Sequence, residues 1–211
     1  GSILNDDATK VSLEEEPTRT ALEVLSKYAR SDAAPDTLST SIEDDNRLSF
    51  EAGESAFMLN YPFVYPSAEA NAPEVFKNLG WAMFPRVTAD EPAHVTLGGV
   101  NIGVGAMSKH PDEAFEAAAC LAGEDNQVYA ATNGGLPPTI ESLYSDDTVR
   151  ETYPFADELV ATFKEATLRP QTPLYNDVSL AVSGTLHPLE DIDPEADVDK
   201  LRDAVTRALN G

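Results

Sequence analysis

The chain has 211 residues, of which 42% are apolar and 24% are charged, the ordinary values of a globular protein. Its 37 acidic residues against 14 Lys plus Arg give a formal net charge of −23, and such a field repels nucleic-acid phosphates and anionic lipid surfaces. No apolar run approaches the roughly 20 residues of a membrane helix, and the single cysteine, Cys120, excludes an internal disulfide and a multi-cysteine metal site.

The first element in chain order is a helix over about 17–30. Pro17 suits the first turn, acidic residues precede it, and Arg30 stands at the end, where a cation is favourable. After a polar loop over 31–41, the sequence predicts a second helix from about residue 44 to 51, which ends at Gly53.

Three apolar segments then predict β-strands, at 56–59, 79–84 and 94–107. The third contains four glycines, so it has to bend or to admit a close neighbour. The rest of the chain predicts helices at 111–121, 124–132, 140–143, 154–165, 176–186 and 195–209. Strands mixed with many helices indicate an α/β fold.

Three features suggest a bound nucleotide or metal at first sight, and each fails on its spacing. Residues 103–109 lack the spacing of a phosphate loop, and 191–197 lack the Gly and the Glu that a calcium loop requires at fixed places. We interpret Asp193 as a helix cap and Pro194 as the first helical residue. The three histidines share no short metal-ligand spacing. We therefore expect no catalytic residue, no metal and no cofactor.

Cys120 falls beside apolar residues in the alanine-rich helix 111–121. The expected state of such a cysteine is a buried and inert thiol.

Three aromatic residues follow the first predicted strand, namely Tyr61, Phe63 and Tyr65. In α/β sheets, ligands gather beyond the carboxyl ends of strands, where a flat ring can stack on the apolar face of a sugar. Packing in the core accounts for these rings equally well, so the sequence leaves both interpretations open.

Arg169 precedes Pro170 in a stretch that cannot form a helix, so its backbone belongs to a defined loop. The planar guanidinium group of arginine carries several N–H donors, which suit sugar hydroxyls or a carboxylate. An ion pair with one of the many surface acids is an equally good interpretation of this arginine.

Taken in order, these features resemble the carboxyl-terminal half of an extracytoplasmic sugar-binding protein of an ABC importer, a family 1 extracellular solute-binding protein. The likeness covers nearly the whole chain, and the last of its segments resembles the trehalose/maltose-binding lipoproteins most. The segments that carry it are 50–61, 81–85, 98–104, 108–114, 133–138 and 169–179.

The resemblance implies six ligand-binding positions: Tyr61, Phe63, Gly98, Gly99, Val100 and Arg169. Tyr61 stands where members place the stacking aromatic ring, and Phe63 is a second candidate ring. The two glycines stand where backbone amides reach the ligand. Val100 stands where some relatives carry a further aromatic ring, and Arg169 where trehalose/maltose-type members carry a sugar-binding arginine.

The resemblance also implies a type II periplasmic-binding-protein fold of two lobes built from discontinuous segments. Residues 1–97 and 148–211 would belong to the carboxyl lobe, and 98–147 to the amino lobe, with the hinge crossed more than once. Members of the family are longer, so we expect this chain to be a fragment. A di- or oligosaccharide would bind between the lobes, and the closed form would dock on the ABC permease.

By the same resemblance the protein is expected outside the cytoplasm, as a monomer, either periplasmic or held at the cell surface by a lipid anchor on the upstream part.

A non-enzymatic receptor competes with two alternatives. One is an acidic glycan-processing enzyme, which needs two carboxyl groups in a cleft, one with a raised pKa. The other is an acidic interaction module without a ligand, which accounts for the charge alone.

Overall fold

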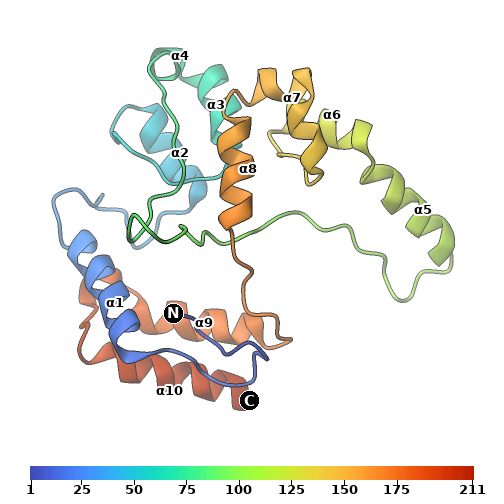
Figure 1. The fold of residues 1–211 in the computed structure, drawn as a ribbon. Coiled ribbons are helices and arrows are strands. Elements are labelled where there is room, and N and C mark those ends of the chain that lie inside the picture. Colours follow the sequence, from blue (N-terminus) through green and yellow to red (C-terminus); the bar gives the residue numbers. More distant parts are fainter. The chain divides into compact units, whose positions relative to one another are not determined.

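The computed structural model describes residues 1–211 and contains helices but no β-strand. The chain divides into two compact units: a first unit of residues 1–41 and 168–211, and a second unit of residues 42–167. None of the helices is long and apolar enough to cross a membrane. In chain order the helices are α1 (Glu15–Ala29), α2 (Glu43–Glu51), α3 (Val64–Asn71), α4 (Pro73–Phe76), α5 (Pro111–Leu121), α6 (Glu124–Gly134), η1 (Glu141–Ser145), α7 (Asp147–Thr152), α8 (Ala156–Glu165), α9 (Tyr175–Leu186), η2 (Leu189–Asp191) and α10 (Asp197–Asn210) (Figure 1).

Most of the predicted helices are confirmed, because their ends carry clear local signals. Helix α1 has Glu15 and Glu16 in its first turn and Lys27 in its last, the arrangement that the helix dipole favours. Helix α2 is followed by Gly53 at a φ of +77°, a left-handed conformation that glycine adopts without a steric cost. Helix α5 begins at Pro111, as expected for a proline that lacks a backbone donor.

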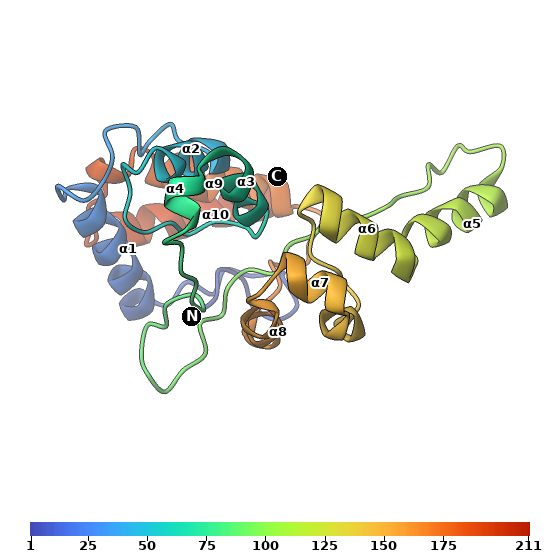
Figure 2. The ribbon, with the colours of Figure 1, turned by 90° about the horizontal axis from the view of Figure 1, so that it is seen from above.

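The core of the first unit lies where α9 and α10 pack side by side (Figures 1 and 2). Its buried side chains come from both helices and from the N-terminal segment: Leu4, Ala8, Val178, Leu201 and Val205. A second cluster joins Leu22 of α1 to Ile192 and Val198. Arg30, just after α1, donates from Nε to the carbonyl of Glu190 at 2.8 Å and from Nη2 to the carbonyl of Ile192 at 2.6 Å. The end of α1 is thus attached to the loop before α10.

The second unit has its own core around α6, α7 and α8, formed by Ala131, Val149, Tyr153 and Phe155. The Tyr153 hydroxyl donates to the carbonyl of Ala131 at 3.2 Å, inside this core. Burial raises the pKa of Tyr153 to about 12, so the hydroxyl stays protonated and remains a donor at neutral pH. This bond fixes the last turns of α6 to the segment between α7 and α8.

The three predicted strands are wrong for this structure. Residues 56–59 and 79–84 have irregular backbone without strand pairing, and in 94–107 pairing is limited to one parallel bridge between Thr96 and Thr167. A strand exists only where its backbone groups find a partner ladder, and an apolar run cannot specify that partner. Side chains along these segments are consequently exposed, among them Phe57, Val100 and Met107.

Three further expectations need correction. No helix was predicted at α3, because a proline such as Pro66 is typical of a chain break. Pro66 instead lies in the first turn of α3, where proline is tolerated. Asp193 does not cap a helix that starts at Pro194; its Oδ1 accepts the N–H groups of Glu195 and Ala196 in a turn that precedes α10.

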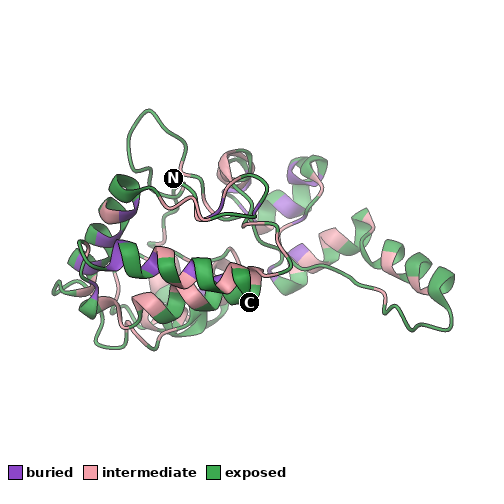
Figure 3. Ribbon diagram, turned by 90° about the horizontal axis from the view of Figure 1, so that it is seen from below, coloured by how far each residue is buried: buried purple, intermediate pink, exposed green.

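Cys120 is exposed rather than buried. Helix α5 carries no buried residue, so its apolar side chains do not cover the thiol, and its ribbon in Figure 3 lacks the colour of buried positions.

The net charge predicts that salt stabilises this protein. At −23, repulsion among acidic groups favours expanded chains, and the ion pairs that salt also weakens lie mostly at the surface. We expect the urea midpoint to rise between about 0.1 M NaCl, where the Debye length is about 10 Å, and about 1 M, where it is about 3 Å. KCl at the same concentrations should give the same rise, and a midpoint that falls with either salt would show that the ion pairs dominate.

The hydrogen bonds of the Asp197 carboxylate lead to the prediction that the protein loses stability in acid. Burial opposes its ionisation, but the hydrogen bonds from Lys200 Nζ at 2.6 Å and from the Asp193 backbone at 2.9 Å together hold the pKa of Asp197 below its usual range. Because the folded pKa is lowered, this stabilisation is present above the unfolded pKa of about 3.9 and is lost as pH falls through the folded value.

The variant Asp197→Asn should therefore lose about 1–2 kcal/mol of unfolding free energy at pH 7 and almost none at the acid end. The control is Asp199→Asn in the same helix, whose carboxyl group is exposed and pairs with Arg202. It should change stability by about 0.5 kcal/mol or less. Equal losses in both variants, measured by urea titration, would refute a special role for Asp197.

Candidate functional site

Tyr61 lies on a turn that joins the extended segment after α2 to the start of α3. Its side chain is 51% exposed, while Phe63, which directly precedes α3, is half-buried. The Val64 N–H donates to the Tyr61 carbonyl at 3.2 Å, so the turn and the first turn of α3 form one hydrogen-bonded piece. This turn is called the Tyr61 turn below and covers residues 60–64.

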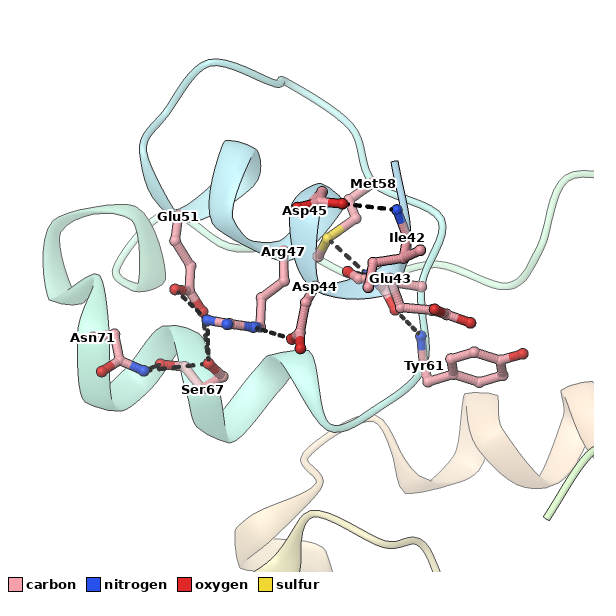
Figure 4. Close-up of polar contacts among 11 residues, drawn as sticks. Ile42, Glu43, Asp44, Asp45, Arg47, Glu51, Met58, Tyr61, Ser67 and Asn71 are labelled. Atoms are coloured by element: carbon pink, nitrogen blue, oxygen red, sulfur yellow. Dashed lines mark hydrogen bonds and ion pairs between the residues drawn. The ribbon is translucent and has the colours of Figure 1, made fainter. Parts of the chain in front are cut away.

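The upstream end of the Tyr61 turn is held by Asn60. Its side-chain Nδ2 donates to the carbonyl of Glu43 at 2.9 Å, and its Oδ1 accepts the Tyr61 N–H at 2.8 Å. One amide side chain therefore attaches the turn to the first residue of α2. The Tyr61 ring lies on the side of the turn away from the polar cluster around Arg47 (Figure 4).

A polar network joins α2 to α3 behind the turn (Figure 4). Arg47 Nη1 lies 2.9 Å from Glu51 Oε2 and 3.2 Å from Ser67 Oγ, and Ser67 Oγ donates to Glu51 Oε1 at 2.7 Å. The hydrogen bond with Asp44 and, after it, those with Glu51 raise the pKa of Arg47, although burial opposes this. The Glu51 side chain is only 8% exposed, and both of its carboxylate oxygens have partners, Arg47 and Ser67.

On its other side α3 packs through Tyr65 into an aromatic cluster. The Tyr65 ring centroid lies 5.0 Å from those of Phe76 and Phe155 and 6.0 Å from that of Trp81. Tyr65 is therefore a packing residue, whereas Tyr61, four positions earlier, turns its ring toward solvent. The structure therefore shows packing for Tyr65 and exposure for Tyr61, and the ligand role of Tyr61 stays a prediction.

Residues 98–100 form an exposed segment without regular secondary structure, in the same unit as the Tyr61 turn. It follows the Thr96–Thr167 bridge, where the Leu97 N–H donates to the Thr167 carbonyl at 2.9 Å and the Thr167 N–H donates to the Val95 carbonyl at 2.8 Å. A Cβ added at Gly99 would meet no atom within 4 Å, and the side chain of Val100 is 76% exposed. The segment thus presents backbone groups without side chains beside them.

Arg169 belongs to the first unit and lies in irregular backbone between Leu168 and the start of α9. The residue is exposed, and Thr172, three positions later, stabilises the start of α9 by accepting the Leu174 N–H at its Oγ1, 3.3 Å away. The structure therefore places five of the six expected site residues in the second unit and Arg169 in the first.

Two groups that hold the Tyr61 turn were missed by the sequence analysis. Nothing marks Asn60 as a link to α2, because the contact is made across an intervening loop. The pair Arg47 and Glu51 has the spacing of an ordinary helical ion pair, and only the burial of Glu51 by α3 distinguishes it. No group of three or more His, Cys, Asp or Glu side chains is arranged to hold a metal ion.

The family model described as bacterial extracellular solute-binding protein matches residues 1–157 of this chain. The chain belongs to this family. The resemblance to extracellular solute-binding proteins and the predicted location outside the cytoplasm are thereby confirmed.

Proteins that are similar in sequence agree with this assignment. A protein of Deinococcus radiodurans described as "Probable ABC transporter-binding protein" is 33% identical over 190 residues, which cover 89% of this chain and 44% of that protein. The diacetylchitobiose-binding protein DasA of Streptomyces coelicolor is 27% identical over 69% of this chain and 35% of its own length. The chain thus spans less than half the length of these curated relatives.

Solved structures show the same fold. Maltose-bound MalE3 of T. maritima matches 98% of this chain and 54% of its own, with a TM-score of 0.79 at 20% identity. An ABC transporter solute-binding protein of Thermotoga lettingae bound to α-D-tagatose matches 99% of this chain and 53% of its own, with a TM-score of 0.71 and 20% identity. The expected fold class is confirmed at this level, although the strands expected within this chain are absent.

The network behind the Tyr61 turn generates a stability prediction. Replacing Arg47 by Met leaves the buried Glu51 carboxylate without its cation, and we expect a loss of about 1–3 kcal/mol of unfolding free energy. Arg19→Met is the matched control, because Arg19 is similarly covered but pairs with acids that are well exposed. The control should lose less than about 1 kcal/mol. Comparable losses in urea titration would show that the Glu51 contact has no special weight.

Proposed function

We propose that this chain forms part of the substrate-binding component of an ABC sugar importer, which captures a di- or oligosaccharide of the trehalose/maltose type. The observation that carries the proposal is the half-exposed Tyr61 ring on a turn fixed by hydrogen bonds on both flanks, in a member of the solute-binding family. Relatives named for maltose, diacetylchitobiose and tagatose support a carbohydrate as the ligand.

In this proposal Tyr61 stacks on the apolar face of a sugar ring, because a flat aromatic face complements the C–H groups of a pyranose. Phe63, half-buried beside it, limits the depth of the site. Gly98 and Gly99 offer backbone N–H groups to sugar hydroxyls, and Val100 adds an apolar contact. Arg169 donates to hydroxyls from its guanidinium fork.

We further propose the two-lobe division, with 1–97 and 148–211 in the carboxyl lobe and 98–147 in the amino lobe. Sugar binding would favour the closed arrangement of the lobes, which the permease recognises. A monomeric receptor and a lipid anchor upstream of this chain belong to the same proposal, because a receptor that delivers its ligand to a membrane permease benefits from a tether that keeps it near the membrane.

Binding without catalysis is the better supported activity. The carboxyl groups on which the structure imposes a pKa shift, Asp157, Glu190 and Asp197, all have lowered values. A glycosidase acid needs a raised pKa beside a second carboxylate. The relatives in sequence and structure are named as binding proteins, which points in the same direction.

The test is isothermal titration of maltose, trehalose and diacetylchitobiose into the longest natural form of the protein that contains this chain. Tyr61→Ala should weaken the best ligand at least about tenfold, which equals about 1.4 kcal/mol, because the stacking face is lost. Tyr61→Phe, which keeps the face, should stay within about threefold, or about 0.65 kcal/mol. Tyr129→Ala is the control, since Tyr129 is an exposed tyrosine of α6 with no proposed role.

A second pair of variants tests the arginine. Arg169→Ala should weaken binding by about tenfold and Arg169→Lys by less, because Lys keeps the charge but not the planar fork. Unchanged affinity in both Tyr61→Ala and Arg169→Ala would refute the site. Release of monosaccharides from any of the sugars during the titration would refute the receptor in favour of an enzyme.

A further inference from the structure

Gly135 closes helix α6 in a conformation that favours glycine. Its φ is +65°, it is buried, and the following Leu136 N–H donates back to the Ala130 carbonyl at 3.3 Å. A left-handed residue at this place ends a helix in many proteins, so this feature alone indicates only a helix end.

The surroundings of Gly135 indicate more than a helix end. A Cβ added there would lie 3.3 Å from Phe63 Cα, 3.4 Å from Phe63 Cβ and 3.4 Å from Pro66 Cγ. All three atoms are tied to the backbone of the Tyr61 turn or of α3, so a Cβ at Gly135 would require the chain to shift by a few tenths of an ångström. The end of α6 therefore packs directly against the turn that presents Tyr61.

The end of α6 is anchored in the core of the second unit. Ala131 is fully buried in the core of the second unit, and its carbonyl accepts the Tyr153 hydroxyl at 3.2 Å. The displacement would thus fall on Phe63 and, through the bond between the Val64 N–H and the Tyr61 carbonyl, on Tyr61. Asn60 holds the opposite end of the turn on α2, which leaves the turn little freedom to adjust.

We propose that Gly135 is a positioning residue of the sugar site: its missing side chain sets where the Tyr61 turn lies and thereby the affinity for sugar. The proposal rests on the proposed function, since it takes Tyr61 as the stacking ring. Gly135 would act without touching the ligand, through its contact with Phe63, which lies more than seventy residues earlier in the sequence.

Three glycines of the same unit allow backbone strain and contact to be separated. Gly135 has a positive φ and a close neighbour, Gly53 has a positive φ of +77° but nothing within 4 Å, and Gly134 has neither. Alanine at Gly53 therefore reports strain alone, and alanine at Gly134 reports the change of side chain alone. Gly135→Asn keeps the contact at lower strain, because Asn adopts the left-handed region more readily than Ala.

The experiment measures sugar affinity by titration, stability by urea, and the amide resonances of Phe63 and Val64 by NMR, in the longest natural form of the protein. Gly135→Ala and Gly135→Asn should both weaken sugar binding at least about fivefold and shift both resonances. Gly53→Ala should lower the urea midpoint but leave affinity within about twofold. Gly134→Ala should leave affinity and both resonances unchanged. The emission of Trp81, the single tryptophan, which packs against Tyr65, reports whether α3 is still in place.

A folded Gly135→Asn protein that binds sugar as tightly as wild type would overturn the proposal. So would an equal loss of affinity in Gly53→Ala, because strain alone would then account for it. If the wild-type protein binds none of the sugars, the proposed function fails. Unshifted resonances of Phe63 and Val64 in Gly135→Asn would then overturn the positioning role as well, and shifted ones would uphold it for the turn itself.

Discussion

The buried carboxylate of Glu51 is the constraint on which the proposed site depends. A charged group removed from water requires partners, and Glu51 finds them in Arg47 on its own helix and in Ser67 on α3. Satisfying this charge therefore fixes α2 against α3. The segment between the two helices is closed at both ends, and Tyr61 comes at its end with its ring directed outward.

Helix α3 is held from three directions by chemically different contacts. The polar network binds it to α2, the Tyr65 ring packs it among Phe76, Trp81 and Phe155, and Gly135 brings the end of α6 against its first turn. A short helix has little stability of its own, so its place comes from these contacts rather than from its sequence. A stacking ring on such a support is ordered before a ligand arrives, which lowers the entropy lost on binding.

Local signals predicted the helices. The absence of strands and the supports of Tyr61 could not be predicted, because they depend on contacts between residues far apart in the sequence. Pro111 and the acids after it mark the start of α5, and Gly53 and Gly135 mark helix ends, because each signal acts within a few residues. The strands failed because pairing depends on a distant ladder. Tyr61 was found as a candidate from its place after an apolar run. Its supports, Asn60 and Gly135, act through contacts across the fold that no local pattern encodes.

The remaining proposed contacts differ from Tyr61 in how the chain holds them. Gly98 follows Thr96 by two residues and Arg169 follows Thr167 by two residues, and Thr96 and Thr167 form the parallel bridge. Both partners of this bridge belong to the second unit, so it fixes where the 98–100 segment begins, whereas Arg169 belongs to the first unit. Tyr61, by contrast, is fixed by side chains within its own unit. Tyr61 thus keeps its place through several contacts, whereas the 98–100 segment depends on one bridge.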